Sequence, residues 1–62
     1  MGHYEIKKSS QNTTQQRFWF VLKASNGEVI ATSEMYTSKQ AAQNGIKSVQ
    51  ENASTTDVRD IT

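Results

Sequence analysis

The sequence predicts an α+β domain with the element order β-β-β-α-β, in which one helix packs on an antiparallel sheet. Two segments near the N-terminus alternate between apolar and polar residues, with the period of a strand. An Asn26-Gly27 pair is typical of a hairpin turn. A later segment repeats its apolar residues with the period of a helix. At 62 residues, the whole chain, residues 1–62, is expected to form one domain.

The first two strands are expected at residues 4–8 and 17–25. In the first, Tyr4 and Ile6 share one side of the sheet. In the second, one face carries Phe18, Phe20, Leu22 and Ala24, and the other carries Arg17, Trp19, Val21, Lys23 and Ser25. Residues 9–16 are eight consecutive uncharged polar residues, which have nothing to bury, so we expect a mobile loop there.

The third strand, residues 28–32, returns after the turn in one of two registers. A two-residue turn would place Leu22 opposite Ala31. A longer turn with Gly27 as a bulge would place Leu22 opposite Ile30. We favour the second register, because it pairs two large side chains on one face of the sheet.

Ser38 is expected to cap the N-terminus of the helix, and Asn52 to end it. One face of this helix carries Ala42, Gly45, Ile46, Val49 and Ala53. Glycine within a helix costs about 1 kcal/mol relative to alanine. We therefore expect the helix to approach the sheet closely at Gly45. Tyr36, just before the helix, is expected to close the core rather than line a pocket.

The chain has little material for a core. Of its 21 apolar residues, five are alanine and one is Met1, and it has no cysteine for a disulfide. A chain of this size buries only about 60% of its unfolded surface. We therefore expect a homodimer in which a weak final strand, residues 57–62, pairs with the sheet of the other chain. The interface is expected to include Val58, Ile61, Trp19 and Val21.

Composition excludes several classes of function. A net charge of +1 from dispersed cations argues against a dedicated duplex binder. The longest apolar run, residues 18–22, is far shorter than the roughly 20 residues that cross a membrane. The N-terminus lacks an apolar signal region, so a cytoplasmic location is expected. One histidine and no cysteine predict no metal and no cofactor. The carboxylates fall in turns, ends and the tail, so no enzymatic activity is expected.

Two functions from different classes fit this pattern. The first is a non-enzymatic interaction module whose ligand is unknown. The alternative is a weak binder of single-stranded nucleic acid that uses the sheet face with Trp19, Arg17 and Lys23, because such binders combine aromatic stacking with cations. Free amides at the helix start, with Ser38 and Lys39, also suggest an anion site. The competing interpretation is that the Lys39 ammonium reaches a carboxylate such as Glu34.

An ordered set of short segments resembles the YegP-like family of small bacterial proteins, a domain of unknown function. They are Leu22-Lys23-Ala24-Ser25-Asn26-Gly27-Glu28, Ile30-Ala31, Ser33-Glu34-Met35-Tyr36, Ser38-Lys39, Gly45-Ile46-Lys47-Ser48-Val49 and Asn52-Ala53. The resemblance runs from residue 4 to the C-terminus. It implies two β3-α-β units, in tandem or from two chains, that share a sheet and exchange their C-terminal strands. It implies a homodimer for this single unit, and it implies no activity, substrate or catalytic residue. Trp19 and Val21 depart from the family, which commonly has polar or basic residues there.

Overall fold

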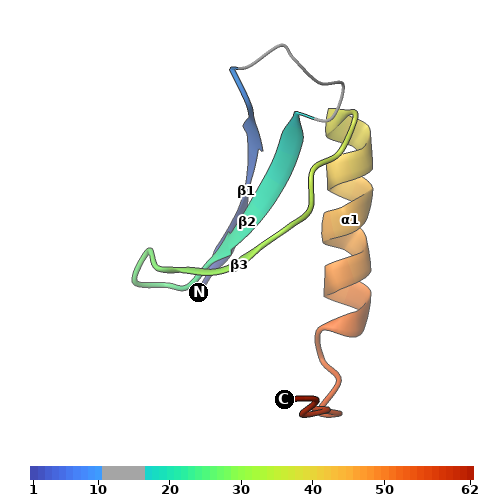
Figure 1. Cartoon of the computed structure of the whole chain (residues 1–62). Helices are drawn as coiled ribbons and strands as arrows, with labels where there is room; N and C mark the ends of the chain where they lie inside the picture. The colour runs from blue at the N-terminus through green and yellow to red at the C-terminus, as the bar shows by residue number, and fades with distance from the viewer. Residues whose placement is uncertain (11–16) are drawn as a thin grey trace.

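The computed structural model describes residues 1–10 and 17–62. Within them it has three strands, β1 (His3–Lys8), β2 (Phe18–Lys23) and β3 (Val29–Thr32), followed by the helix α1 (Lys39–Asn52). The strands form an antiparallel sheet in the order β1-β2-β3, and α1 packs on one face of it (Figure 1). The predicted α+β class, the antiparallel sheet and the single packed helix are confirmed.

The core lies between α1 and the middle of the sheet. Phe20 on β2 is 6% exposed, and the ring of Tyr4 meets its ring edge-on with centroids 6.0 Å apart. The Tyr36 ring stacks on Phe20 at 6.1 Å, and Ala42 of α1 is fully buried. The Tyr36 N–H also donates to the Phe18 carbonyl at 2.6 Å, which ties the segment before α1 to β2. Tyr36 therefore closes the core, as predicted.

The helix begins and passes the sheet as the sequence predicts. The Ser38 hydroxyl caps α1 by accepting a hydrogen bond from the Ala41 N–H at 3.0 Å. A Cβ atom added at Gly45 would collide with the Tyr36 hydroxyl and would lie 3.0 Å from Cε2 of Phe20. The absence of a side chain at Gly45 is therefore what lets the helix come this close. Ala53, expected on the same face, is instead exposed, because it lies past the last helical residue as the C-cap.

The β2–β3 hairpin combines the two registers considered above. Gly27 has φ +87° and donates its N–H to the Ala24 carbonyl at 2.9 Å. Next to this turn, Lys23 lies opposite Val29, which is the register that a Gly27 bulge predicts. The register then shifts between Leu22 and Lys23, so that Leu22 lies opposite Ala31. The predicted pairing of Leu22 with Ile30 is therefore wrong, because this second bulge takes Ile30 out of the ladder.

The strand expected at residues 57–62 is not formed in the single chain: residues 53–62 are irregular and exposed, and they lead away from the sheet (Figure 1). A lone strand has no stable conformation without a partner edge. The exchange of this segment between chains stays a prediction. The mobile loop expected at residues 9–16 lies, from residue 11 on, outside the described residues.

Candidate functional site

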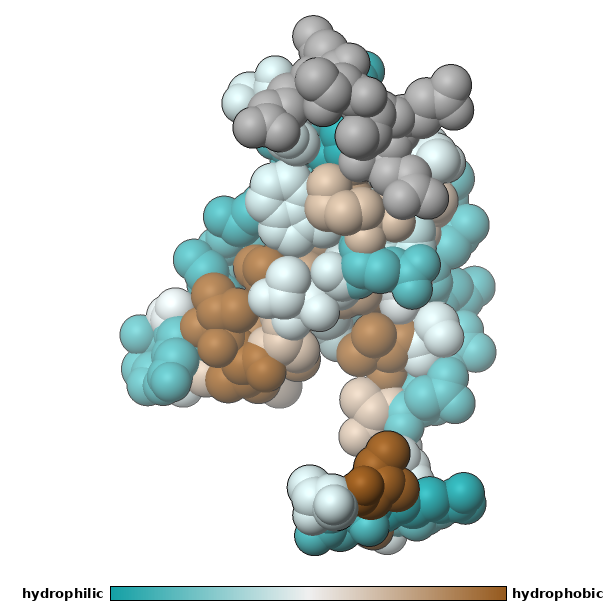
Figure 2. Space-filling model, in the orientation of Figure 1, coloured by the Kyte–Doolittle hydropathy of each residue, from teal (hydrophilic) through white to brown (hydrophobic). Residues whose placement is uncertain are grey.

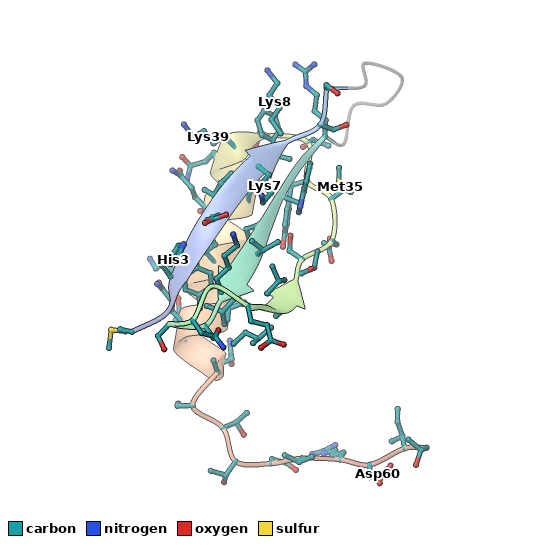
Figure 3. The ribbon with its side chains drawn as sticks, turned by 90° about the vertical axis from the view of Figure 1, so that its left-hand side faces the viewer. His3, Lys7, Lys8, Met35, Lys39 and Asp60 are labelled. Carbon is teal, nitrogen blue, oxygen red and sulfur yellow. The ribbon has the colours of Figure 1, made fainter. Side chains whose placement is uncertain are left out.

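The face of the sheet opposite α1 carries His3, Glu5 and Lys7 of β1 and Lys23 of β2, whereas Lys8 pairs with Phe18 on the other face. Pairing of these strands sets His3 against Lys23, Glu5 against Val21, and Lys7 against Trp19. Residues directly opposite in an antiparallel pair point to the same side. Figure 3 looks onto this face, with α1 behind the sheet and with His3 and Lys7 projecting from β1. We call this surface the open face.

Glu5 is the centre of a charge cluster on the open face. Its carboxylate lies 2.8 Å from Nε2 of His3, 3.3 Å from Nζ of Lys23 and 3.7 Å from Nζ of Lys7. The hydrogen bonds from His3 and then Lys23 lower the pKa of Glu5 below its ordinary value, because both stabilise the carboxylate. One carboxylate therefore shares three basic neighbours, and the cluster as a whole is basic.

Trp19 and Val21 occupy different environments on this face. Val21 is only 5% exposed within the single chain, so it has little area left to bury against a partner. Trp19 is half-buried, with Lys7 directly across from it on β1. The guanidinium of Arg17 lies 6.0 Å from the Phe18 ring, where Lys8 also lies at 5.7 Å. The structure thus groups Arg17 with Lys8 around Phe18, and Lys7 is the cation nearest to Trp19 in register.

At the start of α1, the two residues suggested for an anion site have separate roles. The Ser38 hydroxyl is engaged by the Ala41 amide as the cap. Lys39 is exposed and follows it as the first helical residue. The ion pair of Lys39 with Glu34 that we considered is not among the ion pairs of the described residues. The anion site at Ser38 and Lys39 stays a prediction.

A second surface is apolar and lies at the β3 edge. Val29 and Ile30 are 48% and 61% exposed, and in the tail Val58 and Ile61 are almost fully exposed. Figure 2 views this edge and shows an apolar patch over the β2–β3 hairpin, a hollow between it and α1, and another apolar patch on the tail. The sequence pattern predicted Val58 and Ile61 as interface residues. It did not predict that Val29 and Ile30 are both exposed, because neighbouring residues of a strand point to opposite faces.

Residues 1–10 and 17–62 offer neither a metal site nor a membrane-spanning helix. No three His, Asp or Glu side chains within them come together as metal ligands would. Their helix is neither long nor apolar enough to cross a bilayer.

The architecture and its two surfaces define a class of small α+β domain: a three-stranded antiparallel sheet with one helix, an open basic face and an uncovered apolar edge. The chain belongs to the family described as a domain of unknown function, DUF1508, whose model matches residues 14–60. Relatives named YegP match most of this chain, which confirms the resemblance noted in the sequence.

Individual relatives support this assignment. A UPF0339 protein of Photorhabdus laumondii is 57% identical over 53 residues, which cover 86% of this chain and 43% of that protein. The UPF0339 protein YegP of Escherichia coli is 56% identical over 52 residues, covering 84% of this chain and 44% of YegP. The chain thus spans about half the length of these relatives. The solution structure of a protein from Haloferax volcanii superimposes with a TM-score of 0.77 at 33% identity, covering 95% of this chain and 93% of that one.

Proposed function

We propose that this chain is a non-enzymatic interaction module that works as a homodimer. In this proposal a second copy covers the β3 edge, and residues 57–62 supply the exchanged strand. The observation that carries it is the apolar surface that one copy leaves exposed, on Val29 and Ile30 of β3 and on Val58 and Ile61 of the tail.

The total surface area supports the need for a partner. The chain exposes 5112 Å². A compact folded protein of 7.0 kDa is expected to expose about 4,000 Å². The excess of about 1,000 Å² is close to the roughly 800 Å² that each partner contributes to an interface of standard size. A second copy that took up the irregular tail, residues 53–62, would bury part of this excess.

The two edges of the sheet differ in how well they are protected. β1 ends in two lysines, Lys7 and Lys8, and charged side chains, especially lysine, discourage further strands from pairing. β3 has the sequence VIAT, with no charge, and its outer side has no neighbouring strand in the described structure. Val58 and Ile61 offer matching apolar side chains. The β3 edge is therefore the favoured acceptor for a strand.

The length of the relatives is consistent with pairing of units. The relatives from Photorhabdus laumondii and Escherichia coli are 57% and 56% identical to this chain over the matched segment. That segment is less than half of each relative. Such a protein has room for two units in one chain, where this chain would use two copies. From the proposed interface we omit Val21, which its own chain already buries, and Trp19, which lies on the open face rather than at the β3 edge.

The non-enzymatic part of the proposal rests on the charge clusters. Among the described residues, the ion pairs lie around Glu5 on the open face and between Arg59 and Asp57 in the tail. Both are surface clusters in which the carboxylate is partly or largely exposed, whereas acid–base catalysis needs groups held around a substrate in a pocket. A cytoplasmic location stays a prediction.

The molar mass in solution tests the dimer. Light scattering at 100 µM is expected to give about 14 kDa, twice the chain mass of 7.0 kDa. Ile30→Lys places a charge on the β3 edge and should give a monomer, as should deletion of residues 57–62. Gln43→Lys adds the same charge on the exposed side of α1 and should leave the dimer intact. A wild-type mass of 7 kDa would overturn the proposal, and so would dimers of both edge variants.

A further inference from the structure

We propose that the open face binds single-stranded nucleic acid, with Trp19 as the platform on which a base stacks and with Lys7 and Lys23 as phosphate contacts. This rests on the interaction-module function proposed above but not on the dimer. The open face and the β3 edge are separate surfaces, so both can be occupied at once.

The pairing of β1 with β2 places Lys7 beside Trp19 and leaves Lys23 further along β2 on the same face of the sheet. Lys7 is the cross-strand partner of Trp19, and such partners have Cβ atoms about 5 Å apart. Lys23 lies four residues further along β2 on the same side, a distance of about 13 Å at the rise of a strand. A strand of nucleic acid that runs along β2 would therefore meet a cation beside the indole and another beyond it. Val21, which lies between Trp19 and Lys23 on this side of β2, is buried by its own chain.

Charge selects an anionic partner for this face rather than a second copy. On the open face, Lys7 and Lys23 stand against Glu5 alone, which is two minus one, or +1 with His3 neutral. The Glu5 carboxylate already lies within 4 Å of both Lys7 and Lys23. Two such faces would repel each other, whereas a polyanion would be attracted.

The aromatic side chain selects nucleic acid among the polyanions. Every base has a face that stacks on an indole, and single-strand binders combine such stacking with cations along the backbone. An acidic polypeptide supplies the charges without the bases. The half-buried Trp19 keeps part of its surface accessible beside Lys7.

Titration of the full chain with an oligouridine of 12 nucleotides tests the proposal. The protein has one tryptophan, so quenching of its emission reports on Trp19 itself. If two or three phosphates are neutralised, affinity should fall about 7- to 20-fold between 50 and 200 mM salt. Unchanged emission, or binding that does not depend on salt, overturns the proposal.

Matched variants separate stacking from general charge, with affinity followed by the anisotropy of a labelled oligonucleotide. Trp19→Leu should weaken binding at least about five-fold, and Lys7→Gln should reduce the salt slope by about 0.7. Lys47→Gln removes the same charge from the exposed side of α1 and should change nothing. If circular dichroism shows that Trp19→Leu does not fold, the Lys7→Gln variant tests the proposal instead.

Two outcomes overturn the proposal. One is a loss of affinity in Lys47→Gln as large as that in Lys7→Gln, and the other is binding of polyglutamate as tight as that of the oligonucleotide. Light scattering on the same samples reports the dimer separately.

Discussion

Gly45→Ala is expected to destabilise the protein, although alanine is the better helix former. On an exposed helix this substitution would raise the free energy of unfolding by about 0.8–1.0 kcal/mol. Here the added Cβ would collide with the Tyr36 hydroxyl, and it would lie 2.9 Å from Cζ of Tyr36 and 3.0 Å from Cε2 of Phe20. The result depends on whether these rings can move.

The structure indicates that they cannot move cheaply. The Tyr36 ring is stacked on Phe20 with an interplanar angle of 15°. The Tyr36 carbonyl accepts hydrogen bonds from the N–H groups of Arg17 and Phe18, both at 3.0 Å. Overpacking a fixed core costs about 1–3 kcal/mol. Subtracting the gain in helix propensity leaves a net loss of about 1 kcal/mol, which lowers the melting temperature of a domain this small by about 8 °C.

Thermal unfolding followed by circular dichroism, at equal protein concentrations, measures this loss. Ser48→Ala on the exposed side of α1 is the control, and it should be neutral or slightly stabilising. Tyr36→Phe removes the hydroxyl that Cβ would strike, so Gly45→Ala should cost less in that background, by about 0.5 kcal/mol or more. If Gly45→Ala instead raises the melting temperature, the close approach of α1 to the sheet is refuted.

Three further predictions concern single residues. Ser38→Ala removes the cap on the Ala41 amide and should cost about 1 kcal/mol in urea unfolding, whereas unchanged stability would argue against the cap. Gly27→Ala forces a side chain into φ +87° and should cost about 1–2 kcal/mol, and a neutral result would contradict this turn. Folding lowers the pKa of Glu5 below its ordinary value of 4.5. The ionised Glu5 carboxylate therefore stabilises the fold fully above pH 4.5, and this stabilisation is lost as the pH falls through the lower pKa of the folded state. Urea midpoints from pH 7 to 3 should therefore fall less in Glu5→Gln than in the wild type, and parallel curves would exclude this role of the cluster.

Local signals in the sequence were sufficient for much of the fold. Alternation in β2 identified Phe20 as inward-facing, because side chains of a strand alternate between faces whatever surrounds them. The cap at Ser38 and the close approach at Gly45 also follow from residue type and position within one helix. Each of these depends on residues within a few positions of one another.

What depends on pairing between distant residues was not predictable. The cluster around Glu5 requires the register of β1 against β2, and the polar residues between those strands carry no periodic signal that would fix it. The second bulge was missed because Val29 and Ile30 are both apolar, so the pattern does not say which of them faces inward. The position of Lys7 directly across from Trp19 likewise follows only from that register.

The most direct test of the paired architecture is a filtered nuclear Overhauser experiment on a mixture of isotope-labelled and unlabelled chains. It detects only contacts between different copies. We expect signals between the methyl groups of Val58 or Ile61 in one copy and those of Val29 or Ile30 in the other. A mixture at millimolar concentration that gives no signals between copies would contradict the claim that a second chain completes this sheet.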